Sequence, residues 1–444
     1  MTSHTKQQCL DHTLFSWSKQ SGLNPIHVTK ADGITLTDEN GKTYLDFSSQ
    51  LMNVNIGHNH PHVKDAIKKQ LDEVAYVFPG MTTDVRGQLG KKLAEIAPGN
   101  LNKTFFTTGG SDAIENAIKL ARIVTGKHKI IAKYRSYHGA TYGAASVGGD
   151  PRRHAMDRDQ MPGVVHVEDP YCYRCPWGQT FGSCLHECVK HVERTIQFEG
   201  PDRIAAILFE GESGSSGCIK YPPEYWQKIK ALADKYNILI IVDEVMSGFG
   251  RCGQWFGIEN YGIQPDMIVM AKGLTSGYVP LGGVIVSDPI ADFFNDVSMP
   301  LGLTYSAHAL ACAAAVATLE VYENEDLIAK TRAMGAGLET KLAALKEKHP
   351  SIGDCRVTGL LACIELVKNR ETKEPMVPWN ASAADMAPMM PLMASLREQG
   401  LFTFVRWNFI FIAPPLTITE AELDAGLAMI SNAILLVEGL VSKE

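Results

Sequence analysis

The chain has 444 residues, is 45% hydrophobic and 20% charged, and has a formal net charge of −7. This length is too great for one compact core and indicates about two or three domains. The modest negative charge argues against binding to nucleic acid or to an anionic membrane. No apolar run reaches the roughly 18 residues of a transmembrane helix, and the N-terminus lacks the pattern of a secretory signal. We therefore expect a cytoplasmic protein with reduced thiols.

The first part of the chain predicts short antiparallel strands. Residues 26–49 alternate apolar and polar side chains around two turn pairs, Asp32-Gly33 and Asn40-Gly41. Glycine adopts positive φ angles without steric cost, which suits tight hairpin turns. A helix is expected to begin at about Pro61.

The middle of the chain alternates apolar strands with helices. A helix with apolar positions from 113 to 121 follows a short strand at 103–108. Further strands are predicted at 129–132, 205–209, 238–242, 267–270 and 282–286. Unbroken β-branched runs of this kind are typical of a mainly parallel sheet that helices cover on both faces. The fold class is therefore α/β.

The chain from about residue 320 has a different pattern, with helices at 326–348 and 419–440 and strand-like segments at 355–366 and 402–412. We interpret it as a smaller α+β domain. The predicted division is an N-terminal segment, 1–60, that packs with the small domain, a large domain, 61–320, and the C-terminal small domain, 321–444.

A phosphate site is suggested where the strand at 103–108 meets the next helix. The sequence there is TTGGSD (107–112). Glycine lets the backbone approach a ligand, and free N–H groups at a helix start suit a phosphate. Gly110 and Ser111 are the candidates, although such a sequence alone is more often a simple loop and cap.

Two ionisable residues follow very apolar strands. Asp243 ends the strand ILIIV, and Lys272 follows MIVM. In open α/β sheets, ligands bind beyond the carboxyl ends of the strands. A buried carboxylate needs a cationic or hydrogen-bonding partner, and a desolvated lysine is a better nucleophile. Each residue, taken singly, could also be an ordinary strand end.

An aromatic loop, YRSYHG, completes the set with Tyr137 and His138. The order of phosphate loop, aromatic loop, aspartate and lysine resembles the class III aminotransferases, which are fold-type-I enzymes dependent on pyridoxal phosphate (PLP). The matching segments are TTGGSDAIENAIKLAR, YHGAT, FEGESGSSG, DEVMSGFGRCG, AKGLTSGYVPLGG and LTYSAHALACAAA. The resemblance covers nearly the whole chain and implies a seven-stranded sheet in the large domain.

The resemblance also implies a role for each matching residue. Lys272 would carry the cofactor as a Schiff base and act as general base, and Asp243 would pair with the pyridine nitrogen. The remaining cofactor-binding candidates are Gly110 and Ser111 at the phosphate, Tyr137 and Val245 on the two ring faces, His138 and Glu210 beside the ring, and Thr304 at the phosphate of a neighbouring subunit. Family members form homodimers or larger assemblies, so we expect a homodimer or tetramer with active sites at its interface.

The substrates follow from a finer resemblance. Arg406, in FTFVRWNFIFIAPPL, resembles the family arginine that binds an oxo-acid carboxylate. Ornithine and 4-aminobutyrate enzymes carry an arginine at the position of Ala140 and a switch glutamate at the position of Ser215. This chain lacks both, so we expect it to bind its donor and its second carboxylate differently.

The segments LFSWSKQSGLNPI, GGDPRRHAMDRDQMPGV, DPYCYRCPWGQTFGSC and VRWNFIFIAPPL resemble the taurine aminotransferases. Arg152 and the indole N–H of Trp17 would suit a sulfonate, although packing and a solvated charge are alternative roles. The implied reaction transfers the amino group of taurine to 2-oxoglutarate. The alternatives are pyruvate as acceptor and β-alanine or another ω-amino acid as donor.

Two other readings of the fold remain open. One is a different PLP reaction, such as an aminomutase or racemase, and the other is a non-catalytic scaffold, which predicts that the lysine or the aspartate is missing. The cluster Cys172, Cys175, Cys184 and Cys188 has zinc-like spacing only in its first pair. We expect buried thiols there and no metal.

Overall fold

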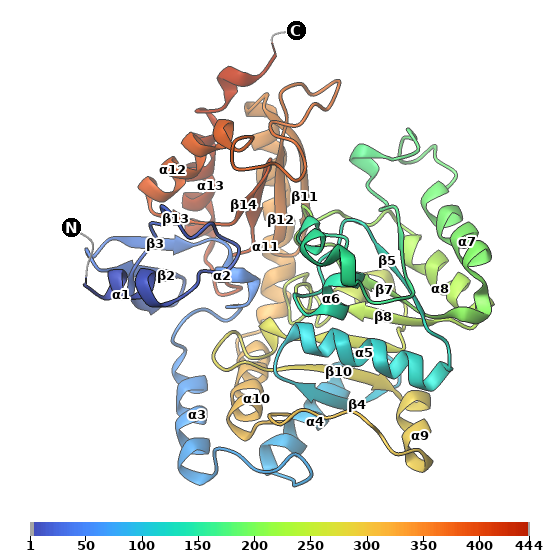
Figure 1. Ribbon diagram of the computed structural model, residues 1–444. Helices are drawn as coiled ribbons and strands as arrows, with labels where there is room; N and C mark the ends of the chain where they lie inside the picture. The colour runs from blue at the N-terminus through green and yellow to red at the C-terminus, as the bar shows by residue number, and fades with distance from the viewer. Residues whose placement is uncertain (1–3, 443–444) are drawn as a thin grey trace.

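The computed structural model describes residues 4–442, apart from the side chains of residues 157–159. Its centre is a seven-stranded sheet in the order β4-β10-β9-β8-β7-β5-β6 (Figure 1). The strands are β4 (Leu101–Thr107), β5 (Lys129–Lys133), β6 (Val164–Val167), β7 (Ile204–Glu210), β8 (Leu239–Asp243), β9 (Met267–Met270) and β10 (Gly282–Ser287). Neighbours pair in parallel except at β10, which is antiparallel to β4 and β9. The predicted mainly parallel sheet is confirmed.

Helices cover both faces of this sheet, as its apolar strands require. In β7, Ala206 and Leu208 pack in one core, and Ile207 and Phe209 pack in the other. The first core includes residues of α5 (Gly110–Thr125), α6 (Tyr142–Val147) and α9 (Asp288–Asp296). The second includes residues of α4 (Asp84–Ile96), α7 (Glu187–Glu199) and α8 (Tyr225–Tyr236). Alternate side chains of a strand point to opposite faces, so both faces of the sheet are buried from solvent.

The N-terminal hairpins share a sheet with the C-terminal part of the chain (Figure 1). This sheet contains β1 (Val28–Asp32), β2 (Thr35–Asp38), β3 (Thr43–Asp46) and β13 (Leu401–Phe402), and Leu45 pairs in parallel with Leu401. A third sheet contains β11 (Ile352–Thr358), β12 (Leu361–Leu366), β15 (Phe409–Ile412) and β14 (Val405–Arg406). The boundaries of the three-part division, near 60 and 320, stay a prediction.

The remaining helices are α1 (His4–His12), α2 (Ser49–Met52), α3 (Pro61–Glu73), α10 (Ala309–Asn324), α11 (Leu327–Lys348), α12 (Met390–Gln399) and α13 (Glu420–Ile434). α3 begins at Pro61 as predicted, because proline suits the first turn of a helix. The strand β6 and the helix α10 were not predicted. In the part of the chain that the structure describes, no helix is long and apolar enough to span a membrane.

A buried arginine joins the three parts of the predicted division. Arg251, which is fully buried, donates from Nη1 to the carbonyl oxygens of Leu360 and Pro414 at 3.1 and 2.6 Å. Its Nη2 donates to Ser49 Oγ and Asn55 Oδ1, both at 2.9 Å. One guanidinium therefore links the N-terminal segment, the loop after β8 and the C-terminal region.

Replacing this arginine should destabilise the whole chain. We expect Arg251→Met to lower the free energy of unfolding by roughly 3 kcal/mol, because four buried acceptors lose their donor. Denaturant titration measures the loss. The control Arg203→Met, at an exposed position, should change it by less than about 0.5 kcal/mol. Equal effects of the two substitutions would contradict the linking role.

Candidate active site

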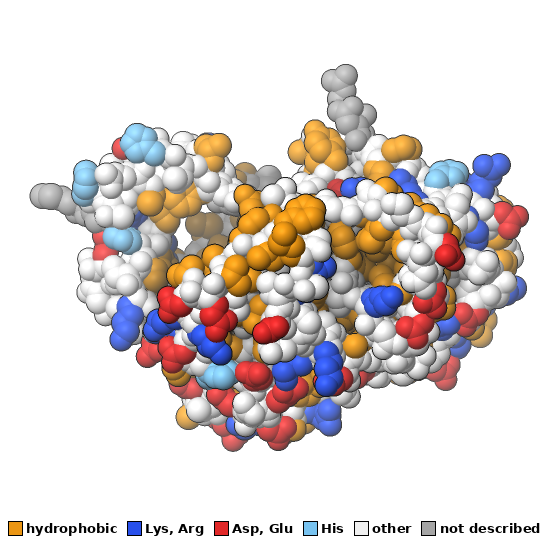
Figure 2. Space-filling model, turned by 90° about the horizontal axis from the view of Figure 1, so that it is seen from below, with side chains coloured by type: hydrophobic (Ala, Val, Ile, Leu, Met, Phe, Trp, Pro, Cys, Tyr) orange, Lys and Arg blue, Asp and Glu red, His pale blue; other side chains and the backbone are white. Residues whose placement is uncertain are grey.

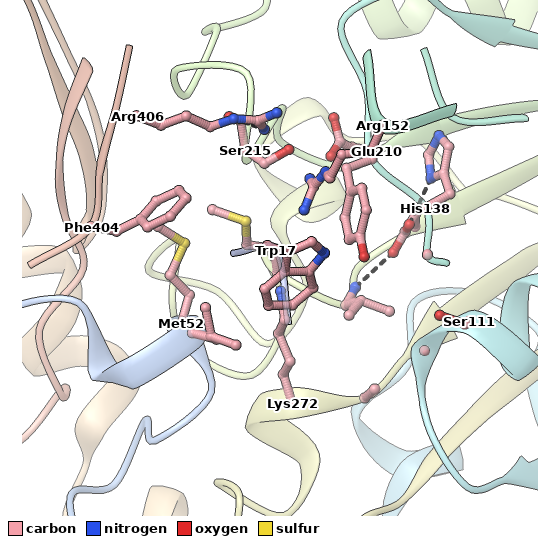
Figure 3. Close-up of a pocket in the computed structure, with 18 of the residues that line it drawn as sticks. Trp17, Met52, Ser111, His138, Arg152, Glu210, Ser215, Lys272, Phe404 and Arg406 are labelled. Carbon is pink, nitrogen blue, oxygen red and sulfur yellow. Dashed lines mark hydrogen bonds and ion pairs between the residues drawn. The ribbon is translucent and has the colours of Figure 1, made fainter. Parts of the chain in front are cut away.

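A cavity of about 710 Å³ opens beyond the carboxyl ends of β7, β8 and β9 (Figure 3). Its walls combine the sheet edge, the N-terminal segment and the chain around β14. They include all residues proposed from the sequence except Thr304, namely Trp17, Gly110, Ser111, Tyr137, His138, Arg152, Glu210, Asp243, Val245, Lys272 and Arg406. Residues from opposite ends of the chain, such as Trp17 and Arg406, thus line one cavity.

Three ionisable residues lie side by side at the sheet edge. Glu210 is the last residue of β7 and pairs in register with Asp243, the last residue of β8. Lys272 follows β9, the next strand, by two residues. Because parallel strands end at the same edge, their C-terminal side chains meet in the crevice where ligands bind.

The Asp243 carboxylate is buried and oriented by two neighbours. His138 Nδ1 lies 2.7 Å from its Oδ2, and the backbone N–H of Val245 donates to its Oδ1 at 3.0 Å. His138 is itself buried, and its Nε2 has no hydrogen-bond partner among the described residues. The histidine therefore fixes the direction of the carboxylate, which faces the pocket as a localised negative charge.

Lys272 has the geometry and environment of a reactive lysine. Its backbone is in the left-handed region, with a φ of 47°, which is strained for a residue with a side chain. Its side chain rises from the turn after β9 toward the centre of the pocket (Figure 3). Removal from water lowers the pKa of its amine, and the negative charges of Asp243 and Glu210 oppose this shift. A lowered pKa makes an amine available as nucleophile and base near neutral pH.

Two buried glutamates, Glu210 and Glu212, line the same pocket as the lysine. Burial raises the pKa of Glu210 to about 7, with the charge of His138 opposing it. Burial also raises the pKa of Glu212 to about 8, although the hydroxyl of Tyr261 donates to its carboxylate at 2.5 Å. Glu212 was not predicted. Its position two residues after Glu210 could have predicted that it faces the same pocket, because residues i and i+2 of an extended chain lie on the same side.

At the end of the pocket that contains Gly110 and Ser111, three segments of the chain approach one another closely. Gly110 is the first residue of α5, and a Cβ at this position would lie 3.1 Å from the Val245 side chain. The N–H of Ala140 donates to Ser111 Oγ at 3.2 Å, and Gly139 has a φ of 138°. The N-terminus of a 16-residue helix with a glycine there offers free N–H groups to an anion.

Two guanidinium groups form the opposite wall. The Arg152 guanidinium lies 4.0 Å from the centroid of the Tyr137 ring and 5.5 Å from that of Trp17. Arg406 lies 4.1 Å over the Trp407 ring, and Figure 3 shows it reaching from the β14 side toward Ser215 and Arg152. The sequence pattern had paired Arg152 with Trp17 on one anion, and the structure brings Arg406 to the same wall.

Both arginines contact a residue that was not predicted, Asp150. It is buried and accepts hydrogen bonds from Arg152 Nε at 2.8 Å and from Arg406 Nη2 at 2.7 Å. The segment GGDPRR, in which an aspartate precedes an arginine by two residues, could have predicted an ion pair between them. The sequence alone did not show whether this aspartate pairs with an arginine or only caps a helix.

Thr304 does not line this cavity. It is exposed, and its carbonyl oxygen accepts a hydrogen bond from Tyr76 Oη at 2.7 Å. The sequence assigned it to the active site of a neighbouring subunit, which stays a prediction.

The cysteine cluster lines a separate small cavity. Cys172, Cys175, Cys184 and Cys188 are free thiols around it, and burial raises the pKa of Cys172 and of Cys188 to about 11. Of these four, only Cys188 is buried and the other three are half-buried, so the expectation of buried thiols is wrong for those three. No group of three or more His, Cys, Asp or Glu residues in the described part of the chain has a geometry that could hold a metal ion. The absence of a metal stays a prediction.

The residues present fit pyridoxal phosphate. A buried carboxylate suits the protonated ring nitrogen, a helix N-terminus suits the phosphate, and a lysine with a lowered pKa suits the aldehyde. Three buried polar atoms of residues in the pocket wall, His138 Nε2, Glu210 Oε2 and Ser215 Oγ, lack hydrogen-bond partners among the described residues. Such orphaned groups are expected where a polar ligand completes the site.

The chain is similar in sequence and in structure to known proteins. The family model of class III aminotransferases matches residues 17–434. The solved structure of a taurine:2-oxoglutarate aminotransferase from Bifidobacterium kashiwanohense, in complex with PLP and glutamate, is 41% identical, with a TM-score of 0.93 and 98% of each chain covered. Taurine–pyruvate aminotransferase of Bilophila wadsworthia is 33% identical over 95% of this chain and 94% of its own.

The similarity extends to a different reaction. A leucine/methionine racemase of Thermococcus litoralis is 36% identical over 93% of this chain and 91% of its own. The family model nevertheless covers almost the whole chain, and the pocket contains the lysine and aspartate that a non-catalytic scaffold would lack. The chain belongs to the class III aminotransferases, and with that family it is a PLP-dependent aminotransferase.

Proposed function

We propose that the protein transfers the amino group of taurine to 2-oxoglutarate, giving sulfoacetaldehyde and glutamate. The observation that carries this proposal is the wall formed by Arg152, Arg406 and Trp17, which faces a lysine fitted for PLP chemistry. A sulfonate has three acceptor oxygens, which suit guanidinium and indole donors. The similarity to taurine aminotransferases adds support.

Lys272 is proposed to anchor the cofactor and to move the proton. When bound, PLP supplies an aldehyde that takes up the amino group and a conjugated ring that delocalises the electrons of the broken C–H bond. The amine of Lys272, with its lowered pKa, can hold the proton that leaves the substrate carbon. Its location between the sheet edge and the arginine wall puts that proton transfer at the centre of the pocket.

Asp243 is proposed to keep the ring nitrogen protonated. Its carboxylate is oriented by His138 and by the N–H of Val245, so it presents a fixed negative charge in a site of low dielectric constant. Val245 and Tyr137 are proposed to contact the two ring faces, with Glu210 beside the ring. Gly110 and Ser111 are proposed to hold the phosphate at the N-terminus of α5.

We also propose a homodimer in which Thr304 reaches the partner's phosphate site. Figure 2 shows hydrophobic side chains gathered on one face of the molecule. Tyr76, Phe78, Met81 and Tyr305 are large, exposed apolar side chains, and the Tyr76 and Tyr305 rings lie 6.0 Å apart. Tyr76 also contacts Thr304. Exposed apolar clusters of this kind are typical of interaction surfaces.

Pyruvate is the alternative acceptor, and β-alanine is the alternative donor. The relative from Bilophila is named for pyruvate, and that from Bifidobacterium for 2-oxoglutarate. Arg406 favours 2-oxoglutarate here, because a second guanidinium beside Arg152 matches a second carboxylate. A racemase, in contrast, would return the same amine with inverted configuration and consume no oxo acid.

The first test is a half-reaction. Holoenzyme mixed with taurine and no oxo acid should lose its yellow absorbance, because the amino group stays on the cofactor. Subsequent 2-oxoglutarate should restore the absorbance, and a spectrophotometer follows both steps. An unchanged spectrum with taurine, but loss of absorbance with β-alanine, would contradict the proposed donor and leave the enzyme class standing.

Lysine 272 is tested by substitution. Lys272→Ala should lower kcat by at least about 10³-fold, because anchor and proton carrier are lost together. Circular dichroism should report an unchanged fold. The control Lys119→Ala, on the exposed side of α5, should keep kcat within about twofold. Activity of Lys272→Ala at the level of the control would rule out the assigned role.

Substitution of Arg152 tests the proposed contact with the sulfonate. Arg152→Met should raise KM for taurine by about 30-fold, since a charge-assisted contact is lost, and should leave KM for an uncharged primary amine within about twofold. Steady-state kinetics with both donors measures the difference. Arg153→Met, next in the chain and outside the wall of the main pocket, is the matched control. Parallel changes for both donors would argue against a sulfonate contact.

A further inference from the structure

Asp150 joins the two arginines of the pocket wall. Its Oδ1 accepts from the backbone N–H of Arg152 at 3.0 Å and from Arg152 Nε at 2.8 Å. Its Oδ2 accepts from Arg152 Nη2 at 3.2 Å and from Arg406 Nη2 at 2.7 Å. A single carboxylate therefore holds the guanidinium assigned to the donor and the one assigned to the acceptor.

The backbone fixes Asp150 in this place. Its N–H donates to Ser136 O at 3.0 Å. The preceding residue must be glycine, because a Cβ at Gly149 would lie 2.0 Å from Tyr134 O. The Asp150 side chain is only 4% exposed, and it does not belong to the wall of the main cavity. The carboxylate thus lies behind the two arginines as seen from the pocket.

The charges explain why a carboxylate is needed there. Two guanidinium groups that face one cavity repel each other, and the repulsion grows in a partly buried site. Burial alone would raise the pKa of Asp150, but the hydrogen bonds from Arg152 and the charge of Arg406 outweigh it and lower the pKa below its ordinary value. Asp150 is therefore ionised at neutral pH and leaves one net positive charge on the group of three.

The two arginines are held unequally. Arg152 uses Nε and Nη2, two nitrogens of one edge, as well as its backbone N–H. Arg406 uses Nη2 alone, while its Nη1 lies 3.5 Å from Ser215 O. Residue 215 supplies no carboxylate, so Asp150 is the acidic partner that the structure gives to Arg406. Arg406 is the more easily released of the two.

We propose that Asp150 is a positioning residue with two tasks: it orients Arg152 toward the donor, and it is the internal counter-ion of Arg406. It neutralises Arg406 while a donor with one anionic group is bound. It then gives up Arg406 to the carboxylate of the oxo acid. The inference rests on the proposed use of a sulfonate donor and an oxo-acid acceptor in one pocket.

The counter-ion role makes opposite predictions for the two substrates. Without the negative charge, a dianionic acceptor no longer competes with Asp150 for Arg406 and should bind more tightly. The donor should bind more weakly, because Arg152 loses the partner that orients it. A pocket that is merely damaged would bind both substrates more weakly. The direction of the two changes therefore separates the alternatives.

Binding is measured first, with glutarate as an unreactive dicarboxylate probe. Trp17 and Trp407 lie beside the two arginines, so tryptophan fluorescence of the holoenzyme should report glutarate binding. We expect Asp150→Asn to lower the Kd of glutarate by about tenfold and Arg406→Met to raise it by at least about tenfold. In the Arg406→Met background, Asp150→Asn should change Kd by less than about twofold.

Asp354→Asn is the matched control. Asp354 pairs with the buried Arg356 at 2.7 Å, outside the main cavity, so its neutralisation should leave glutarate binding within about twofold of the wild type. Weaker glutarate binding by Asp150→Asn would overturn the inference. Equal tightening with and without Arg406 would also overturn it, because the charge would then not act through that residue.

Steady-state kinetics supply the second readout. In Asp150→Asn, KM should fall for 2-oxoglutarate and rise for taurine, each by about tenfold, and Asp150→Glu should move both back toward the wild-type values. KM values that rise together would contradict the counter-ion role. The glutarate experiment does not depend on the donor, so a failure of taurine as substrate would show in the half-reaction and leave this binding test intact.

Discussion

The active site depends on the burial of three ionisable side chains at one edge of an apolar sheet. Glu210, Asp243 and Lys272 end or follow three adjacent parallel strands whose other side chains are buried and apolar. Burial disfavours the charged forms of Glu210 and Lys272, and the negative charges of Glu210 and Asp243 partly offset this cost for the lysine. The parallel register of β7, β8 and β9 is what puts them there.

The opposite wall, which contains Arg152 and Arg406, must balance its positive charge between two kinds of substrate. In the proposed reaction, two substrates of unlike charge use one cavity in turn, so the positive charge that suits a dianionic oxo acid is excessive for a donor with one anionic group. A buried carboxylate behind Arg152 and Arg406 reduces that excess without occupying the cavity. Arg152 is the second residue of the 3-10 helix Pro151–Asp159, Asp150 is the N-cap of that helix, and Arg406 belongs to β14.

The sheet edge was accessible to prediction because its signals are local. Apolar strands are visible as runs of β-branched residues, and a charged residue directly after such a run is rare enough to be noticed, as with Asp243 and Lys272. The strand positions agree within a few residues, and β9 begins and ends where it was predicted. The antiparallel direction of β10 could not be predicted, because periodicity contains no information on strand direction.

The arginine wall was accessible only in part, because its signals are not local. Arg152 and Arg406 were found by resemblance, but their shared contact with Asp150 joins positions that the sequence separates by about 250 residues, since 406 − 150 = 256. Glu212 was overlooked because its burial and its hydrogen bond from Tyr261 join positions 49 residues apart in the chain. Thr304 lies outside the cavity of a single chain, and its assigned role requires a second subunit.

The central claim, that one pocket transfers nitrogen from a sulfonate donor to an oxo acid, is tested most directly by isotope tracing. Holoenzyme is incubated with ¹⁵N-taurine and 2-oxoglutarate, and the products are analysed by mass spectrometry. The account predicts ¹⁵N-glutamate and sulfoacetaldehyde in equal amounts. The contradicting result is that ¹⁵N-taurine stays intact and no ¹⁵N-glutamate forms, while the same enzyme preparation transfers nitrogen from another amine to 2-oxoglutarate.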